Sequence, residues 1–298
     1  MEADLVREAF GTQGQYLVVF LEEVVAQLGN ARYSFMPEHE FKELLISNPK
    51  EGNRIYVTEI LYRAHFAAAT ALLRCQRWVQ GVVAARQLPN LLSFAASYRG
   101  LIESAADTLD PFLLAGPTLA SAWSVIRAVL DGAMQREFHI FGPIEEALIH
   151  FMYARRLTRK ERVGTPASHQ PKSSAQYIEL LERAKVPDVR ECYAFLCELT
   201  HPAADSVFAY AHGHGSGHLI ELWPDADYHR ISEFCKSYQG TGGQAIMLNL
   251  NSALIMLKIL NIFQLKTVYT RSVESINLSA VRAWTDIMGS LRAQGWRD

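Results

Sequence analysis

The sequence predicts a mainly α-helical protein: a multi-helix bundle with a long helical hairpin and one small β-hairpin near residues 206–223. Apolar residues recur at helical spacing through most of the 298 residues. Two long helical patterns, 55–86 and one that starts after Pro89, are joined by a short connection, so they should pack as a hairpin or meet at a kink. Only the stretch around residues 206–223 has the short apolar runs and glycine-rich turn of paired strands.

The composition is that of an ordinary globular protein, with 49% hydrophobic and 20% charged residues. A formal charge of -2 gives no overall attraction to nucleic acid or to acidic membranes, so any such binding must be local. The four cysteines lack the paired spacing of zinc sites, which favours a reduced, intracellular protein. The start of the chain lacks a signal-peptide pattern, and the most apolar stretch, 245–265, contains several polar residues. We therefore expect a cytoplasmic protein without a membrane span.

The predicted organisation is an N-terminal helical extension (1–54), a helical bundle (55–270) and a C-terminal helix with a polar tail (271–298). The extension begins with an amphipathic pattern over 3–28, which Gly11 and Gly14 interrupt and which ends at Gly29-Asn30. A shorter helix is expected over 37–46, before a turn-rich stretch.

The predicted bundle begins with the helix over 55–86, which would be about 48 Å long at 1.5 Å per residue. The next helix should start after Pro89 and continue to Leu109, because Asp110-Pro111 is a typical helix end. Shorter helical patterns follow, around an exposed loop at 163–174 that is rich in glycine, proline and serine. They cover residues 118–130, 143–159, 174–184 and 188–200.

The C-terminal part of the bundle contains the predicted β-hairpin. Val207–Tyr210 and His218–Leu222 flank its glycine-rich turn. Helices are expected over 225–238 and 244–269, separated by a turn at Gln239–Gly243, and a last helix over 278–291.

The residue on which the functional prediction depends is His201. An apolar helical pattern runs into it, and Pro202 disfavours helical backbone at the residue before it, so His201 should lie at or just past a helix C-terminus. The partial negative charge of that helix end favours an imidazolium, and histidine titrates near neutral pH, as an acid, base or anion contact requires. The alternative is that His201 only caps the last carbonyl groups of the helix.

Arg99 and Glu103 are four residues apart on one predicted helical face, and Asp107 extends this row by another turn. An ordinary solvated ion pair explains such a spacing. If the row faces His201, however, Arg99 can hold a phosphate and Glu103 can orient it or the histidine.

Together, Arg99-Gly100-Leu101-Ile102-Glu103 and the later segment Tyr193-Ala194-Phe195-Leu196-Cys197-Glu198-Leu199-Thr200-His201-Pro202 resemble the HEPN superfamily of helical-bundle proteins. The likeness is to bacterial relatives with an arginine and a glutamate on one helix and a Tyr-x-x-Leu-x-x-x-x-His-Pro-like segment on a later one. It covers roughly residues 55–269, and about ten positions carry it.

This resemblance implies a helical bundle, often dimeric, of bacterial defence (antiviral) or toxin systems, with a metal-independent ribonuclease site in the active members. It implies that His201 is the acid, base or phosphate contact, that Arg99 binds phosphate and that Glu103 and Tyr193 belong to the same site. No cofactor is implied. Active members carry an arginine a few residues before the histidine, whereas positions 194–196 are Ala, Phe and Leu here.

That missing arginine favours a second hypothesis, a non-catalytic dimerisation or regulatory module that binds a protein partner of the same system. A third hypothesis is a metal-dependent hydrolase that uses His212, His214 and His218 of the predicted hairpin. The third is disfavoured because no acidic or cysteine residue lies in that run and a flexible turn orders ligands poorly.

The densest group of positive charges lies at the end of the predicted helix over 143–159 and at the start of the loop that follows it. Cations stabilise a helix C-terminus, so a solvated last turn accounts for much of it. The same charges suit the backbone of RNA, and binding through them would depend strongly on salt. We call this group the basic cluster; it consists of Arg155, Arg156, Arg159, Lys160 and Arg162.

Overall fold

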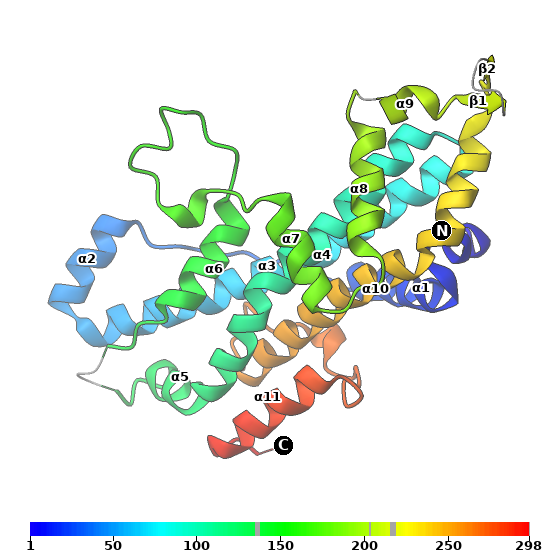
Figure 1. Ribbon diagram of the computed structural model, residues 1–298. Coiled ribbons are helices and arrows are strands. Elements are labelled where there is room, and N and C mark those ends of the chain that lie inside the picture. Colours follow the sequence, from blue (N-terminus) through cyan, green and yellow to red (C-terminus); the bar gives the residue numbers. More distant parts are fainter. Residues whose placement is uncertain (135–137, 203, 215–218, 298) are drawn as a thin grey trace. The chain divides into compact units, whose positions relative to one another are not determined.

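The computed structural model describes residues 1–134, 138–202, 204–214 and 219–297, and it is mainly helical with one small antiparallel sheet (Figure 1). The predicted fold class is therefore confirmed. The helices and strands are α1 (Ala3–Ala26), α2 (Glu38–Ser47), α3 (Pro49–Gln87), α4 (Leu91–Ser121), α5 (Trp123–Leu130), α6 (Gly142–Tyr153), α7 (Ser174–Arg183), α8 (Val189–Thr200), α9 (Ala204–Phe208), β1 (Ala211–His214), β2 (Leu219–Leu222), α10 (Ala226–Ile262) and α11 (Arg282–Ala293).

The chain forms two compact units, and each is built from three separate segments. Unit 1 consists of Met1–Ala26, Leu72–Asp107 and Lys172–Leu250; unit 2 consists of Gln27–Ala71, Thr108–Pro171 and Asn251–Asp298. The helices α3, α4 and α10 contribute residues to both units. Neither unit is contiguous in sequence, whereas the three predicted domains are.

The core of unit 1 is organised around Tyr98 of α4, which is fully buried. Its ring lies 4.9 Å from that of Phe234 on α10 and 5.8 Å from that of Phe10 on α1, measured between ring centroids. Its hydroxyl donates to the backbone carbonyl of Tyr238 at 2.8 Å. Aromatic burial with a partner for the polar end is the usual way to place a tyrosine inside a core.

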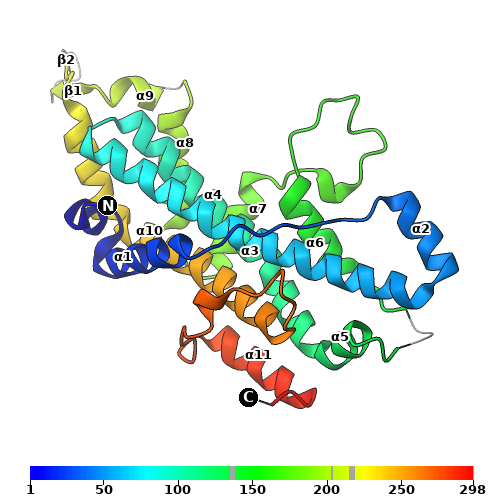
Figure 2. The ribbon, with the colours of Figure 1, turned by 180° about the vertical axis from the view of Figure 1, so that it is seen from behind.

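Helix α10 runs without a break through residues 239–243, so the turn predicted there is wrong. Two of its glycines allow close packing instead. A Cβ atom at Gly242 would overlap the hydroxyl of Tyr98, and one at Gly243 would lie 2.8 Å from the carbonyl oxygen of Phe10. Figure 2 shows α1 beside α10. Glycine is therefore needed at these two positions because it has no Cβ atom, and not because of its conformational freedom.

In unit 2, the helical segments end where local sequence rules do not place them. Helix α4 continues through Pro111 and Pro117, so the end predicted at Asp110-Pro111 is wrong. Residues next to Pro111, such as Leu109 and Phe112, are buried, and this packing offsets the hydrogen bond that proline cannot donate. Helix α6 ends at Tyr153, earlier than the predicted 159. The backbone becomes extended at Ala154, and the Arg155 N–H donates to the His169 carbonyl at 3.1 Å instead of to a carbonyl of the helix.

The connection from α1 to α2 runs back along α3 in unit 2 (Figure 2). The hydroxyl of Tyr33 lies 2.6 Å from Nδ1 of His65, and Nε2 of His65 lies 2.8 Å from the hydroxyl of Thr270. His65 is buried, and burial lowers its pKa to about 4. A neutral imidazole thus links two irregular segments to α3.

The β-hairpin pairs β1 with β2 in antiparallel register, from Ala211 opposite Leu222 to His214 opposite Leu219. The first strand lies later than predicted, because residues 204–208 form the short helix α9. The described side chains of β2 are all exposed.

Among the described helices, α10 is long and apolar enough to cross a membrane, and α4 with α5, bent by 71°, would qualify as a broken span. In the most apolar 18-residue stretch of α10, 67% is buried inside the protein, which is typical of a core helix in a soluble protein. Length and composition therefore do not place this chain in a membrane.

Candidate functional site

Three of the predicted site residues meet in unit 1, where α8 packs on α4. The Arg99 Nε donates to Oε1 of Glu103 at 3.1 Å, and the Tyr193 hydroxyl donates to the same oxygen at 2.5 Å. The Arg99 guanidinium also lies over the Tyr193 ring, 5.5 Å from its centroid. A cation, a carboxylate and a phenol thus form one cluster, although Glu103 and Tyr193 are 90 residues apart in the sequence.

Arg99 makes a further contact that the sequence did not indicate. Its Nη1 donates to the hydroxyl of Thr200 at 3.2 Å, and that hydroxyl donates in turn to the backbone carbonyl of Leu196 at 2.8 Å. The Arg99 side chain remains 27% exposed and that of Glu103 34% exposed. The cluster is therefore ordered by neighbours but accessible to a ligand.

The charges of this cluster favour a protonated phenol and a charged guanidinium. Burial, followed by the hydrogen bond to Glu103, raises the pKa of Tyr193 to about 12. Burial opposes the charge of Arg99, but Glu103 and Tyr193 together outweigh it and raise the pKa of the guanidinium. At neutral pH Tyr193 is a hydrogen-bond donor, and Arg99 is a cation that can bind an anionic oxygen.

His201 directly follows Thr200 and caps α8, as predicted from Pro202. Its backbone is extended, with φ −97° and ψ 151°, and its N–H donates to the Cys197 carbonyl at 3.0 Å. Its side chain is exposed and makes no hydrogen bond or ion pair with the described residues. The structure thus brings Arg99, Glu103 and Tyr193 into mutual contact. It places His201 directly after Thr200, which contacts Arg99.

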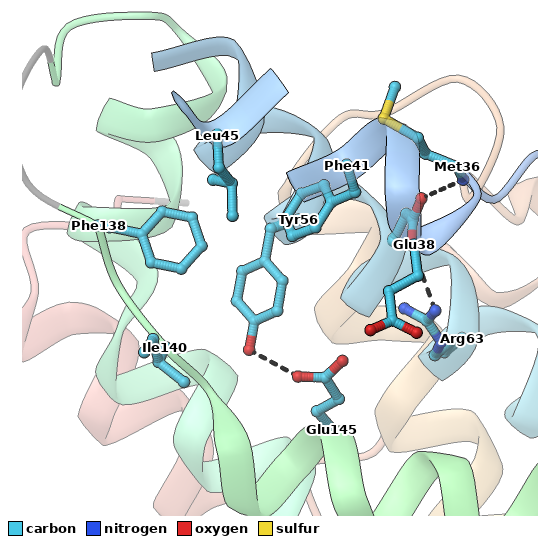
Figure 3. A pocket seen from close by; sticks show the side chains of 10 residues that line it. Met36, Glu38, Phe41, Leu45, Tyr56, Arg63, Phe138, Ile140 and Glu145 are labelled. Carbon is cyan, nitrogen blue, oxygen red and sulfur yellow. Dashed lines mark hydrogen bonds and ion pairs between the residues drawn. The ribbon is translucent and has the colours of Figure 1, made fainter. Parts of the chain in front are cut away.

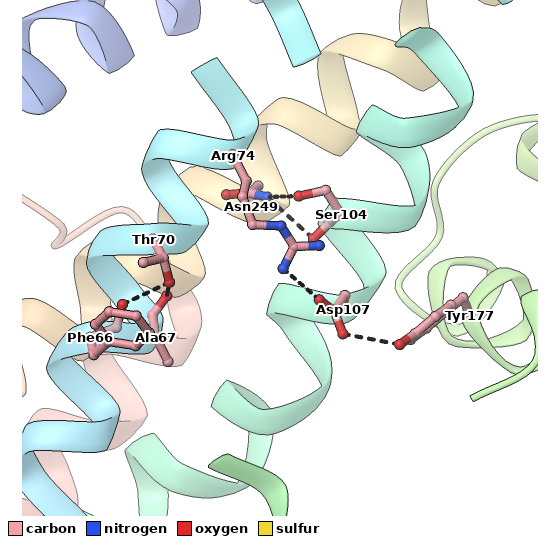
Figure 4. Close-up of polar contacts among 8 residues, drawn as sticks. All are labelled: Phe66, Ala67, Thr70, Arg74, Ser104, Asp107, Tyr177 and Asn249. Carbon is pink, nitrogen blue, oxygen red and sulfur yellow. Dashed lines mark hydrogen bonds and ion pairs between the residues drawn. The ribbon is translucent and has the colours of Figure 1, made fainter. Parts of the chain in front are cut away.

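The α4 polar row, defined here as Arg99, Glu103 and Asp107, continues past this cluster. One oxygen of Asp107 accepts from Arg74 of α3 at 2.7 Å, and the other accepts from the hydroxyl of Tyr177 of α7 at 3.0 Å (Figure 4). Each member of the row therefore binds a hydroxyl on α7 or α8. The helical spacing identified the row, but these partners have no local sequence signal.

On the buried side of α4, Ser104 accepts from the side-chain amide of Asn249 on α10, through its carbonyl at 3.3 Å and its hydroxyl at 3.5 Å (Figure 4). Both residues are buried. This contact fixes α4 against α10 and so supports the face that carries the polar row.

The basic cluster lies in unit 2, in the irregular segment after α6 and not in its last helical turn. The helix-end explanation of these charges is therefore wrong, because residues beyond Ala154 lie outside the helix. Arg155 pairs with Glu161 at 2.6 Å. The other four side chains are exposed and form no ion pair within the part of the chain that the structure describes.

The predicted histidine group is only partly described. The His212 ring stacks on Trp223, with centroids 3.9 Å apart and an angle of 25°. His218 and the side chain of His214 lie outside the described residues. Within the described ranges, no three His, Cys, Asp or Glu side chains are grouped so that they could hold a metal ion.

No family model matches the chain, and neither a curated protein nor a solved structure matches it. The class defined by fold and site is a helical bundle with a polar cluster between two of its helices.

Proposed function

We propose that this chain is a HEPN-like protein of a bacterial defence or toxin system, and that the cluster on α4 and α8 binds and cleaves RNA without a metal. The observation that supports the proposal is the contact between Arg99 Nη1 and the Thr200 hydroxyl, at 3.2 Å. It fixes a cation beside the residue that precedes an exposed histidine. A guanidinium and an imidazole from two helices can then act on one phosphodiester.

In the proposed reaction, Arg99 contacts a non-bridging oxygen of the phosphate and stabilises the negative charge that grows there. The 2′-oxygen of the ribose bonds to phosphorus and gives up its proton to water. The bond from phosphorus to the 5′-oxygen breaks, and an imidazolium at His201 protonates that leaving oxygen.

Glu103 and Tyr193 are positioning residues in this proposal. Glu103 holds Nε of Arg99, which leaves part of the guanidinium to face a ligand, and the Tyr193 hydroxyl holds the carboxylate. The basic cluster of unit 2 would attract the RNA backbone. The proposal also places the protein in the cytoplasm as a homo-oligomer, with RNA or a protein of the same system as partner.

The test is cleavage of a labelled single-stranded RNA by the full chain in the presence of a chelator. We expect fragments that end in a 2′,3′-cyclic phosphate, and no cleavage of DNA of the same sequence, because DNA lacks the 2′-hydroxyl. His201→Ala should lose the activity, whereas His39→Ala, which removes another exposed histidine, should retain it. Absence of wild-type cleavage, or equal cleavage by His201→Ala, would refute the catalytic proposal.

A second candidate function, a non-catalytic dimerisation or regulatory module, is favoured by the continuation of the α4 polar row. Asp107 is held by Arg74 and Tyr177 in the way that Glu103 is held by Arg99 and Tyr193. In this candidate function, the repeated pattern has a purely structural role: it joins α4 to α7 and α8. An inactive wild-type protein whose Arg99→Ala variant is less stable would support this candidate.

A further inference from the structure

Unit 2 contains a cavity of about 350 Å³ that the proposed ribonuclease site does not use. Its walls come from α2 and the residue segment before it, from α3, and from α6 and the segment before it (Figure 3). Its volume lies in the range of pockets that bind small molecules, which begins at about 300 Å³.

Most of the cavity wall is apolar, and three aromatic rings dominate it. The ring of Tyr56 lies 6.4 Å from that of Phe41 and 5.4 Å from that of Phe138, and both pairs are tilted. Figure 3 shows these rings with Leu45 and Ile140 around the same space. Aromatic faces carry partial negative charge, so such a wall suits an apolar group and also a cation.

The charges that line the cavity do not balance. Glu38 pairs with Lys42 at 2.6 Å, and Glu59 pairs with Arg63 at 3.2 Å. Glu145 lines the cavity as well, but it forms no ion pair within the described residues. Among the residues that the structure describes, the carboxylate of Glu145 is therefore the one in this cavity without a positive partner.

Tyr56 holds that carboxylate in place. Its hydroxyl accepts from the backbone N–H of Phe141 at 3.0 Å and donates to Oε2 of Glu145 at 3.0 Å (Figure 3). Its side chain is buried, with 8% of the residue exposed, and burial raises the pKa of the phenol to about 12, so it stays a donor at neutral pH. Glu145 also lies in the first helical turn of α6, where negative charge is stabilised.

We propose that this cavity binds a small organic cation: an ammonium group that pairs with Glu145, joined to an aromatic or apolar body that packs against Phe41, Tyr56 and Phe138. A single positive charge balances the unpaired carboxylate. The rings supply both the apolar contact and the attraction for a cation that aromatic binding sites provide. This inference is independent of the proposed ribonuclease function, because every lining residue belongs to unit 2.

The first test is titration calorimetry of the full chain with three probes of similar size. The phenethylammonium ion carries the positive charge, 2-phenylethanol is neutral and 3-phenylpropanoate is negative. We expect saturable binding of phenethylammonium, and binding weaker by about tenfold or more for each of the other two, because they lose a charge-assisted contact. Equal binding of the alcohol, or no saturable binding of the cation up to millimolar concentration, would overturn the proposal.

The second test uses a matched pair of variants. Glu145→Gln keeps the shape of the side chain but removes its charge, and it should weaken phenethylammonium binding by about tenfold. Glu146→Gln makes the same change at the next residue, which is exposed and does not line the cavity, and it should bind as the wild type does. Unchanged affinity in Glu145→Gln, with a wild-type circular dichroism spectrum, would contradict the assignment. The wild-type probe series does not depend on how either variant folds.

Discussion

The hydroxyl of Tyr193 on α8 donates to the carboxylate of Glu103 on α4 at 2.5 Å, and this bond joins two helices from distant parts of the chain. The same oxygen, Oε1 of Glu103, also accepts a hydrogen bond from Nε of Arg99, so it takes part in both the bond to Tyr193 and the ion pair with Arg99. Glu103 is thus the centre of the cluster, whichever function the cluster has.

The contribution of this hydrogen bond to stability can be measured by replacing Tyr193 and Glu103 one at a time and together. Tyr193→Phe should lower the free energy of unfolding by about 1 kcal/mol, since a partly exposed hydrogen bond to a charged group is lost. Glu103→Gln should have a similar effect. In urea denaturation the double variant should lose less than the sum, because both single changes remove the same bond. Strict additivity would show that the two side chains are not coupled.

The glycines of α10 should differ sharply in their tolerance of a methyl group. Gly242→Ala should destabilise the protein by about 1–3 kcal/mol, because the added Cβ overlaps the Tyr98 hydroxyl inside a packed core. Gly240→Ala is the control, because its Cβ would lie 3.8 Å from Pro187, an ordinary contact. Alanine should stabilise the helix there by up to about 1 kcal/mol. Thermal unfolding of both variants decides the matter, and equal effects would be inconsistent with this packing.

Stability should fall in acid because of His65, whose pKa burial lowers from 6.5 to about 4. Between these pH values the unfolded chain binds more protons than the folded one. The stabilisation from this group is therefore complete above pH 6.5 and declines as the pH drops toward 4, by up to about 3 kcal/mol. Urea denaturation at several pH values should show this decline in the wild type and a shallower one in His65→Gln. His39→Gln, at an exposed site, should keep the wild-type slope.

If RNA binds through the basic cluster, its affinity should depend on salt in proportion to the charges used. Changing Arg156, Arg159 and Lys160 together to alanine should reduce the slope of log K against log salt concentration by about 2 for a single strand. Arg282→Ala removes a cation of α11 whose side chain is 95% exposed, and it should leave the slope unchanged. Fluorescence anisotropy with a labelled RNA at several salt concentrations provides the measurement. An unchanged slope in the triple variant would exclude the cluster as the RNA contact.

The sequence predicted the long helices and the position of His201 because these depend on local patterns. Apolar spacing defined most of the helices, and Pro202 defined the end of α8. The same local rules failed at Pro111 and at residues 239–243, where tertiary packing decides the outcome. Buried neighbours hold α4 through its proline, and Tyr98 and Phe10 require glycine inside α10.

The candidate site was predictable only in part, for a similar reason. The spacing of Arg99, Glu103 and Asp107 along one helix was readable, whereas Thr200, Arg74 and Tyr177 reach that row from other helices. The cavity around Tyr56 had no signal in the sequence, because its wall combines residues of α2, α3 and α6. That Glu145 lacks an ion pair among the described residues can be recognised only once its neighbours in space are known.

The division of the chain into interleaved segments has a consequence for its synthesis. A ribosome releases residues 1–26 and 72–107 long before residues 172–250, which complete unit 1, and unit 2 has to wait for the segment that begins at Asn251. Apolar faces such as that of α1 therefore stay without their final neighbours during most of translation. We expect neither unit to complete its core before its last segment has emerged, so that unit 1 folds no earlier than the synthesis of residue 250.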